Sequence, residues 1–233
     1  MQSVQHSASS AEDNMFEAWW AKQGEWVEEP NVRRGGESGV QRIYDDNGNL
    51  LYSKRQTGHI HRSWRHPFGR LTVLRERDAL TGASQAGVNV PKIVYCATSG
   101  ERGLLVTAAL EGYQTIEDWY AGGGREQYSE ALHSQLLQTV GVNIARLNRA
   151  RWQHGCIYAK HVFVYVEGEG ASAKAHAALL DLEKCRQRLT SKQAALHDMK
   201  QLRRHSNWSA ADWKILKDAY EQEFGRTLSE LPD

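Results

Sequence analysis

The hydrophobic pattern of the chain changes at Gly122-Gly123-Gly124. Before this glycine joint, short apolar runs are interrupted by Gly, Asn and Asp, which is typical of strands and turns. After it, apolar residues recur at helical spacing over residues 132–147. The residues that would share one broad helical face are Leu132, Leu136, Leu137, Val140, Ile144 and Leu147. A chain that places its strands first and its helices last, without alternation, predicts an α+β fold.

The first half predicts a small antiparallel sheet with one helix. Asp46-Asn47-Gly48 separates apolar runs at residues 40–44 and 50–53, which is a hairpin signal. A charged stretch over residues 70–78 then carries apolar residues at near-helical spacing and ends at Gly82 or Gly87. Two further strands are expected at residues 90–95 and 103–107. After the long helix, the pattern predicts strands at residues 162–166 and 177–180, followed by helices over residues 191–230.

These patterns divide the chain into three parts. Residues 1–14 are polar and are expected to form a disordered tail, residues 15–111 a β-rich lobe, and residues 112–233 a helical lobe. The second part opens with an aromatic cluster that lacks the basic face of a membrane-surface helix, and we expect it to pack in a core. The cluster consists of Phe16, Trp19, Trp20 and Trp26.

Charge, cysteine content and hydropathy exclude several classes of protein. The 233 residues carry a net charge of only +1, which gives no electrostatic reason to expect a nucleic-acid partner. The three widely spaced cysteines, Cys96, Cys156 and Cys185, are odd in number and predict free thiols in a reducing compartment. Neither a signal sequence nor an apolar stretch of transmembrane length is visible. We therefore expect a cytoplasmic protein.

The order of polar motifs along the chain is that of a kinase. A glycine-rich hairpin precedes a strand lysine, a helical glutamate, a long helix, a histidine-containing loop and an aspartate that ends a strand. Over residues 31–198 the sequence resembles the lipopolysaccharide kinase (Kdo/WaaP-like) family, and particularly its InaA-like branch. The resemblance implies a bilobal protein-kinase-like fold, ATP and Mg²⁺ as cofactors, and a sugar hydroxyl of the lipopolysaccharide core as acceptor. It also implies work at the inner face of the inner membrane, with peripheral association.

The resemblance assigns nucleotide contacts to the first half. Gly35, Gly36 and Gly39 match the glycine-rich loop, where the absence of side chains lets backbone amides approach phosphates; an ordinary flexible turn is the alternative. Lys54 would meet the ATP phosphates and form an ion pair with Glu76. Residues 107–112 match the inter-lobe hinge, where the backbone at Leu110 and Glu111 would receive adenine.

The catalytic positions lie in the second half. Asp181 ends an apolar strand and is the expected Mg²⁺ ligand, with capping of the next segment as the alternative role. His161 occupies the position of the family's second metal-binding residue. Asp198 matches a helical aspartate that braces the catalytic loop, and His154 is expected to brace that loop against the strand that ends at Asp181.

Cys156 stands where the resemblance places the catalytic aspartate. A thiol is a poor general base unless His154, Lys160 or His161 stabilises its thiolate. Three alternatives therefore remain: a catalytic cysteine, an inert packed cysteine, and a zinc ligand with His154 and His161. The substitution also supports a pseudokinase that binds nucleotide or a protein partner without transferring phosphate.

Residues 57–68 form a cationic segment that is expected to be a loop. It carries His59, His61, Arg62, Arg65 and His66 around Trp64. Arginine makes bidentate contacts with phosphate, so this segment would suit an anionic acceptor such as a phosphorylated sugar or an acidic headgroup. A solvated loop is the alternative.

Overall fold

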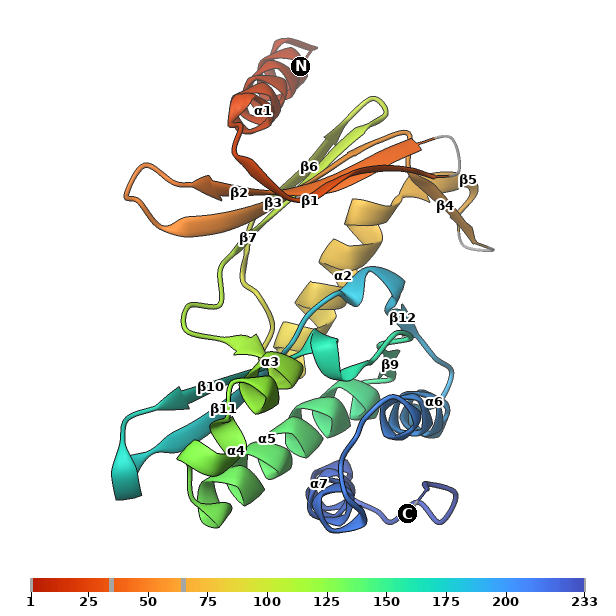
Figure 1. Cartoon of the computed structure of the whole chain (residues 1–233). Coiled ribbons are helices and arrows are strands. Elements are labelled where there is room, and N and C mark those ends of the chain that lie inside the picture. Colours follow the sequence, from red (N-terminus) through yellow and green to blue (C-terminus); the bar gives the residue numbers. More distant parts are fainter. Residues whose placement is uncertain (1, 34–35, 64–65, 233) are drawn as a thin grey trace. The chain divides into compact units, whose positions relative to one another are not determined.

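The computed structural model describes residues 2–33, 36–63 and 66–232. The chain divides into two compact units, each described by itself (Figure 1). The first contains Met1–Asp78 and Lys92–Ala109, and the second contains Ala79–Pro91 and Leu110–Asp233. This division differs from the expected boundary between residues 111 and 112 because Ala79–Pro91 belongs to the second unit. Gly82 lies near the end of the helix Thr72–Gln85, and a Cβ on it would lie 2.3 Å from the Trp152 indole nitrogen. The end of that helix therefore packs tightly within the second unit.

A five-stranded antiparallel sheet forms the first unit, in the order β1-β2-β3-β7-β6. Its strands are β1 (Glu25–Arg33), β2 (Gly36–Tyr44), β3 (Leu50–Thr57), β6 (Ile93–Ser99) and β7 (Arg102–Ala108). The predicted β2–β3 hairpin is confirmed, with Tyr44 opposite Leu50. Its turn is closed by Asp45, whose carboxylate accepts from the backbone N–H groups of Asn47 and Asn49.

Helix α1 (Gln2–Ala21) precedes the sheet and is longer than the sequence predicted. The helix includes residues 2–14, which we expected to form a disordered tail. It continues from the segment that carries Phe16, Trp19 and Trp20 toward the N-terminus. Phe16 is buried with apolar residues of the sheet, and Trp19 and Trp20 pack against this core. Trp26 lies on β1 and is 37% exposed, so the aromatic cluster is only partly core.

Two further elements of the first unit follow β3. The segment predicted as a cationic loop instead forms a short hairpin of β4 (Ile60–Ser63) and β5 (His66–Leu71). The loop prediction was wrong because cationic residues of this segment lie on the paired strands themselves, His61 opposite Arg70 and His66 opposite Ser63. The predicted helix is present as α2 (Thr72–Gln85), although only its first half belongs to this unit.

Long helices make up most of the second unit. These are α5 (Glu130–Arg149), α6 (Ser191–Arg204) and α7 (Ala210–Phe224), joined to the short helices α3 (Ile116–Ala121) and α4 (Gly124–Gln127). The predicted face of α5 is confirmed: each of its six predicted apolar residues is buried. Gly141 lets α5 approach α7, since a Cβ there would lie 2.4 Å from the carbonyl oxygen of Leu216.

Short strands and 3₁₀ turns of the second unit carry the candidate site. Strands β10 (Val162–Glu167), β11 (Lys174–Leu179) and β8 (Gln114–Thr115) form one small sheet, and β9 (Trp152–Gln153) pairs with β12 (Arg186–Gln187). The 3₁₀ turns are η1 (Ala159–His161), η2 (Gly170–Ser172) and η3 (Leu182–Lys184). Across the described part of the chain, no helix has the length and apolar character needed to cross a membrane. The three cysteines are free, as predicted.

Candidate functional site

The first unit contains the predicted ion pair between Lys54 and Glu76. The Lys54 ammonium lies 2.7 Å from a carboxylate oxygen of Glu76, and both side chains are less than one-fifth exposed. Lys54 projects from the middle strand of the sheet, between β2 and β7, and Glu76 from the second turn of α2. Partial burial limits solvent screening, so this pair holds the lysine in one position more firmly than a surface pair would.

Gln56 fixes the start of α2 relative to β3, and the sequence did not reveal this role. Its side-chain oxygen accepts from the backbone N–H of Val73 at 3.0 Å, one of the helix N-terminal donors that has no partner within the helix. Its side-chain nitrogen donates to the hydroxyls of Thr72 and Ser38. Gln56 is buried and lies two residues from Lys54, so these bonds hold the strand that carries the lysine against the helix that carries Glu76.

The glycines of the predicted glycine-rich loop can be explained by close packing as well as by contact with a ligand. Arg34 and Gly35 lie outside the described residues. A Cβ on Gly36 would meet the backbone nitrogen of His59 at 2.4 Å, and one on Gly39 would meet the Trp26 ring at 2.7 Å. Both glycines are therefore required by close neighbours. Their contact with phosphate stays a prediction.

The expected hinge follows β7 at the boundary of the two units. Leu110 is partly buried and Glu111 is exposed. The carbonyl oxygen of Leu110 accepts from the backbone N–H of Tyr113 at 3.2 Å, which closes a turn. Adenine recognition by this backbone stays a prediction.

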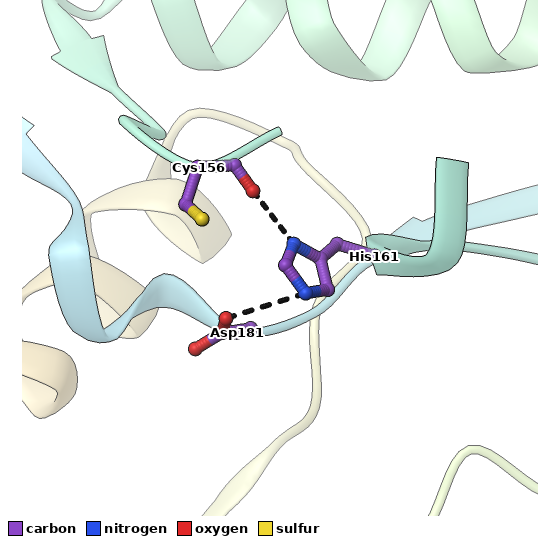
Figure 2. Close-up of side chains that lie close together, drawn as sticks. All are labelled: Cys156, His161 and Asp181. Carbon is purple, nitrogen blue, oxygen red and sulfur yellow. Dashed lines mark hydrogen bonds and ion pairs between the residues drawn. The ribbon is translucent and has the colours of Figure 1, made fainter. Parts of the chain in front are cut away.

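In the second unit, Cys156, His161 and Asp181 lie together (Figure 2). Cys156 sits on the loop after β9, His161 ends η1, and Asp181 follows β11. The imidazole of His161 lies between the other two residues: its Nδ1 is 2.6 Å from the Cys156 carbonyl oxygen and its Nε2 is 3.4 Å from an Asp181 carboxylate oxygen. The structure therefore brings together two residues of the predicted catalytic loop, Cys156 and His161, and the predicted magnesium ligand Asp181.

The backbone of Asp181 is in the left-handed region, at φ 58° and ψ 58°. Aspartate tolerates this conformation better than most residues that carry a Cβ. Its carboxylate makes no capping bond to the turn η3 that follows, so the capping role considered above is not observed. The carboxylate is 40% exposed and points to the cluster rather than to the backbone.

Asp198 holds the loop that carries Cys156, as predicted. It is fully buried, and its carboxylate accepts from the backbone N–H groups of His154 at 2.7 Å and Gly155 at 3.1 Å, and from the side-chain amide of Asn148 at 2.8 Å. His154 also braces the loop as predicted, because its Nε2 lies 2.9 Å from the carbonyl oxygen of Leu180. Complete burial lowers the pKa of His154, so the ring is neutral and Nε2 donates.

The surroundings of Cys156 differ from those expected. Cys156 is buried, with 7% of its surface exposed, and the Lys184 ammonium lies 3.8 Å from its sulfur. Lys160 is exposed, and the carbonyl rather than the sulfur of Cys156 bonds His161. His154 is not part of the ligand cluster, so the zinc site proposed with His154 is replaced by a cluster that includes Asp181.

The donor set of this cluster fits Mg²⁺ only through Asp181. Magnesium prefers oxygen ligands and commonly takes one or two protein carboxylates together with phosphate and water oxygens. The exposed carboxylate of Asp181 meets that requirement. An imidazole nitrogen and a sulfur do not, because they are softer ligands that suit zinc, copper and iron.

A model of the lipopolysaccharide kinase (Kdo/WaaP) family matches residues 17–220. This chain belongs to that family. Protein InaA of Escherichia coli (strain K12) is 42% identical over 218 residues, which cover 91% of this chain and 98% of that protein. A solved structure titled "WaaP in complex with acyl carrier protein" matches with a TM-score of 0.69 and 19% identity, over 89% of this chain and 82% of that chain. The structural likeness supports the kinase-like fold.

Family membership confirms the resemblance drawn from the order of motifs, and with it the α+β kinase-like fold. It supports a kinase-type phosphotransferase as the general class of this protein. The structure brings Lys54 and Glu76 together and gathers Cys156, His161 and Asp181 in one cluster; the family roles expected for these residues stay predictions. The departure lies at Cys156, which has no carboxylate to accept a proton.

Proposed function

We propose that this protein is an ATP- and Mg²⁺-dependent kinase that transfers the γ-phosphate of ATP to a sugar hydroxyl of the lipopolysaccharide core. The observation that carries the proposal is the partly buried ion pair between Lys54 and Glu76. A lysine held in this way on a central strand is the group that kinases use to fix the ATP phosphates. Structural packing alone gives no reason to place two charges there, because burying them has a desolvation cost.

Each residue has a distinct proposed role. Lys54 binds the phosphates, Glu76 orients Lys54, and Gln56 keeps their two elements together. In the second unit, Asp181 is the protein ligand for the magnesium ion that neutralises phosphate charge when it is bound. The backbone at Leu110 and Glu111 receives adenine.

Cys156 and its neighbours act on the acceptor. Proton removal by a general base typically contributes about 10²–10⁴ in rate, whereas phosphoryl transfer depends mainly on positioning and charge neutralisation. The kinase can therefore work without an aspartate at this position. Cys156 stands in the place of that aspartate, with the Lys184 ammonium 3.8 Å from its sulfur, and its side chain is the proposed acceptor of the hydroxyl proton.

The β4–β5 hairpin is proposed to receive the anionic acceptor. His61 and Arg62 lie on β4, and Arg62 is exposed. Trp64 and Arg65, which the prediction also invoked, lie outside the described residues. Exposed Phe68 at the same hairpin suits the proposed peripheral contact with the inner membrane from the cytoplasmic side, because an aromatic ring next to basic residues favours a lipid interface.

A pseudokinase is the second candidate, and Cys156 is the observation that favours it. In that case the protein binds nucleotide through Lys54 and acts on a protein partner or in a stress response without transferring phosphate. The kinase and the nucleotide-binding form of the pseudokinase share nucleotide binding and differ in phosphate transfer; a pseudokinase that acts only through a protein partner lacks both.

Thermal denaturation with increasing ATP, with and without Mg²⁺, tests what the candidates share. A ligand that binds only the folded state adds about 2.7 kcal/mol at a concentration 100 times its Kd. We expect stabilisation by ATP in the wild-type protein and its loss in Lys54→Ala. The control is Lys22→Ala, which removes a surface lysine of the same unit that pairs with Asp46. Absence of any ATP effect on the wild-type protein would contradict the kinase and the nucleotide-binding pseudokinase, and would leave only a pseudokinase that acts through a protein partner.

A further inference from the structure

We propose that Cys156, His161 and Asp181 form a binding site for a thiophilic divalent cation such as Zn²⁺. One ligand atom from each residue lies within 4.8 Å of the other two. The three donors are a thiol, an imidazole and a carboxylate, and zinc sites combine these three types. They come from three separate segments, so the fold, not local sequence, brings them together (Figure 2).

The hydrogen bond of His161 prepares its ring for a metal. The Cys156 carbonyl can only accept, so Nδ1 of His161 carries the proton of their 2.6 Å bond. In the neutral ring, Nε2 then presents a lone pair, and it faces a carboxylate oxygen of Asp181 at 3.4 Å. A cation bound between these two acceptors would satisfy both of them. A backbone carbonyl that fixes the other ring nitrogen is the usual support of a metal-binding histidine.

The distances suit tetrahedral coordination. Zinc bonds of about 2.0–2.3 Å place neighbouring ligand atoms about 3.3–3.8 Å apart. The separation of 3.4 Å between His161 Nε2 and Asp181 falls within that range. All three ligand atoms lie within 4.8 Å of one another, so any pair that exceeds the tetrahedral range has to approach by about 1 Å, through changes in side-chain torsions.

Charge and access complete the argument. A thiolate and a carboxylate together balance a divalent ion, with the imidazole neutral and the thiol proton released to solvent. The Lys184 ammonium lies 3.8 Å from the sulfur. Asp181 is 40% exposed, so solvent reaches the site and a water molecule can fill the fourth position.

The nature of the donors separates this ion from Mg²⁺. Without nucleotide, the cluster offers magnesium one hard oxygen ligand, whereas it offers zinc three ligands of suitable softness. Both ions would need Asp181. Bound zinc would therefore compete with the binding of Mg²⁺ and nucleotide at Asp181. This regulatory consequence rests on the proposed kinase function, whereas the zinc site itself does not.

Titration with Co²⁺ in the absence of nucleotide tests the site directly. Cobalt bound to a thiolate gives a sulfur-to-metal charge-transfer band, and tetrahedral coordination gives intense visible bands. We expect both bands, saturating at one ion per chain and disappearing when Zn²⁺ is added. Excess Mg²⁺ should leave them unchanged.

Variants identify the ligands. Cys156→Ser should abolish the charge-transfer band and weaken Zn²⁺ binding at least tenfold in competition with a chromogenic chelator. His161→Gln keeps the thiol, and should weaken binding to a similar extent. The control is Cys96→Ser, which removes a free cysteine of the other unit and should change neither result. Circular dichroism of each variant verifies that it is folded.

Three results would overturn the site: no cobalt–thiolate band in the wild-type protein, an unchanged band in folded Cys156→Ser, or displacement of the ion by magnesium. None of these measurements involves ATP. A protein that binds cobalt through Cys156 but shows no ATP stabilisation would retain the metal site and lose the proposed function. The reverse result would lose the metal site alone.

Discussion

Replacement of Asp198 should destabilise the second unit strongly. Its buried carboxylate accepts three hydrogen bonds of 2.7–3.1 Å, two of them from the backbone of the loop that leads to Cys156, and the His197 ring nitrogen lies 3.2 Å from it. Asp198→Ala would leave three buried donors without a partner, at about 1–3 kcal/mol each. Because the variant also removes the desolvation cost of the carboxylate, we expect a net loss of about 3–5 kcal/mol.

Thermal unfolding measures this loss. For a chain of this size, about 4 kcal/mol corresponds to a decrease of roughly 10 °C in Tm. Asp198→Asn retains one oxygen acceptor and should lie between the wild-type protein and Asp198→Ala. The matched control is Asp218→Ala, which removes an exposed aspartate from α7 and should leave Tm nearly unchanged. A Tm for Asp198→Ala within 2 °C of the wild-type value, on the order of 1 kcal/mol or less, would refute the bracing role.

Three further predictions follow from the same contacts. Burial lowers the pKa of His154, so below about pH 6.5 the unfolded chain takes up a proton that the folded chain does not. The free energy of unfolding should therefore fall by up to about 1.4 kcal/mol for each pH unit of acidification. In denaturant titrations at a series of pH values, His154→Gln should show a shallower decline. Gln56→Ala should cost about 2–3 kcal/mol in urea unfolding, whereas Gln187→Ala, at an exposed site, should cost nothing measurable. Arg62→Ala should raise the KM for the acceptor in a phosphate-transfer assay and leave the Kd for ATP unchanged. An equal weakening of ATP binding would contradict acceptor recognition by the hairpin.

Much of the fold could be predicted because its signals are local. The β2–β3 hairpin follows from Asp46-Asn47-Gly48, and α5 follows from the apolar spacing over residues 132–147. The order of motifs then identified the kinase-like fold, although no single motif was specific. The β4–β5 hairpin was missed because cationic residues obscured its alternation.

The contacts of the site could be predicted only in part. The pair of Lys54 and Glu76 was predicted because family resemblance fixed which two residues meet. The cap from Gln56 to α2 was not predicted, since nothing in the local sequence distinguishes a buried glutamine from an exposed one. Likewise, Lys184 lies 28 residues from Cys156, so its contact with the thiol depends entirely on the tertiary fold.

The most direct test of the proposed function is transfer of γ-labelled ATP to purified lipopolysaccharide core oligosaccharide. Wild-type protein and Cys156→Asp are compared under the same Mg²⁺ concentration, with Lys54→Ala as the inactive control. We predict that the wild-type protein labels the sugar, that Cys156→Asp labels it faster, by up to about 10²–10⁴, and that Lys54→Ala does not label it. A wild-type protein that binds ATP but transfers no label to the core oligosaccharide would contradict the kinase and leave the pseudokinase.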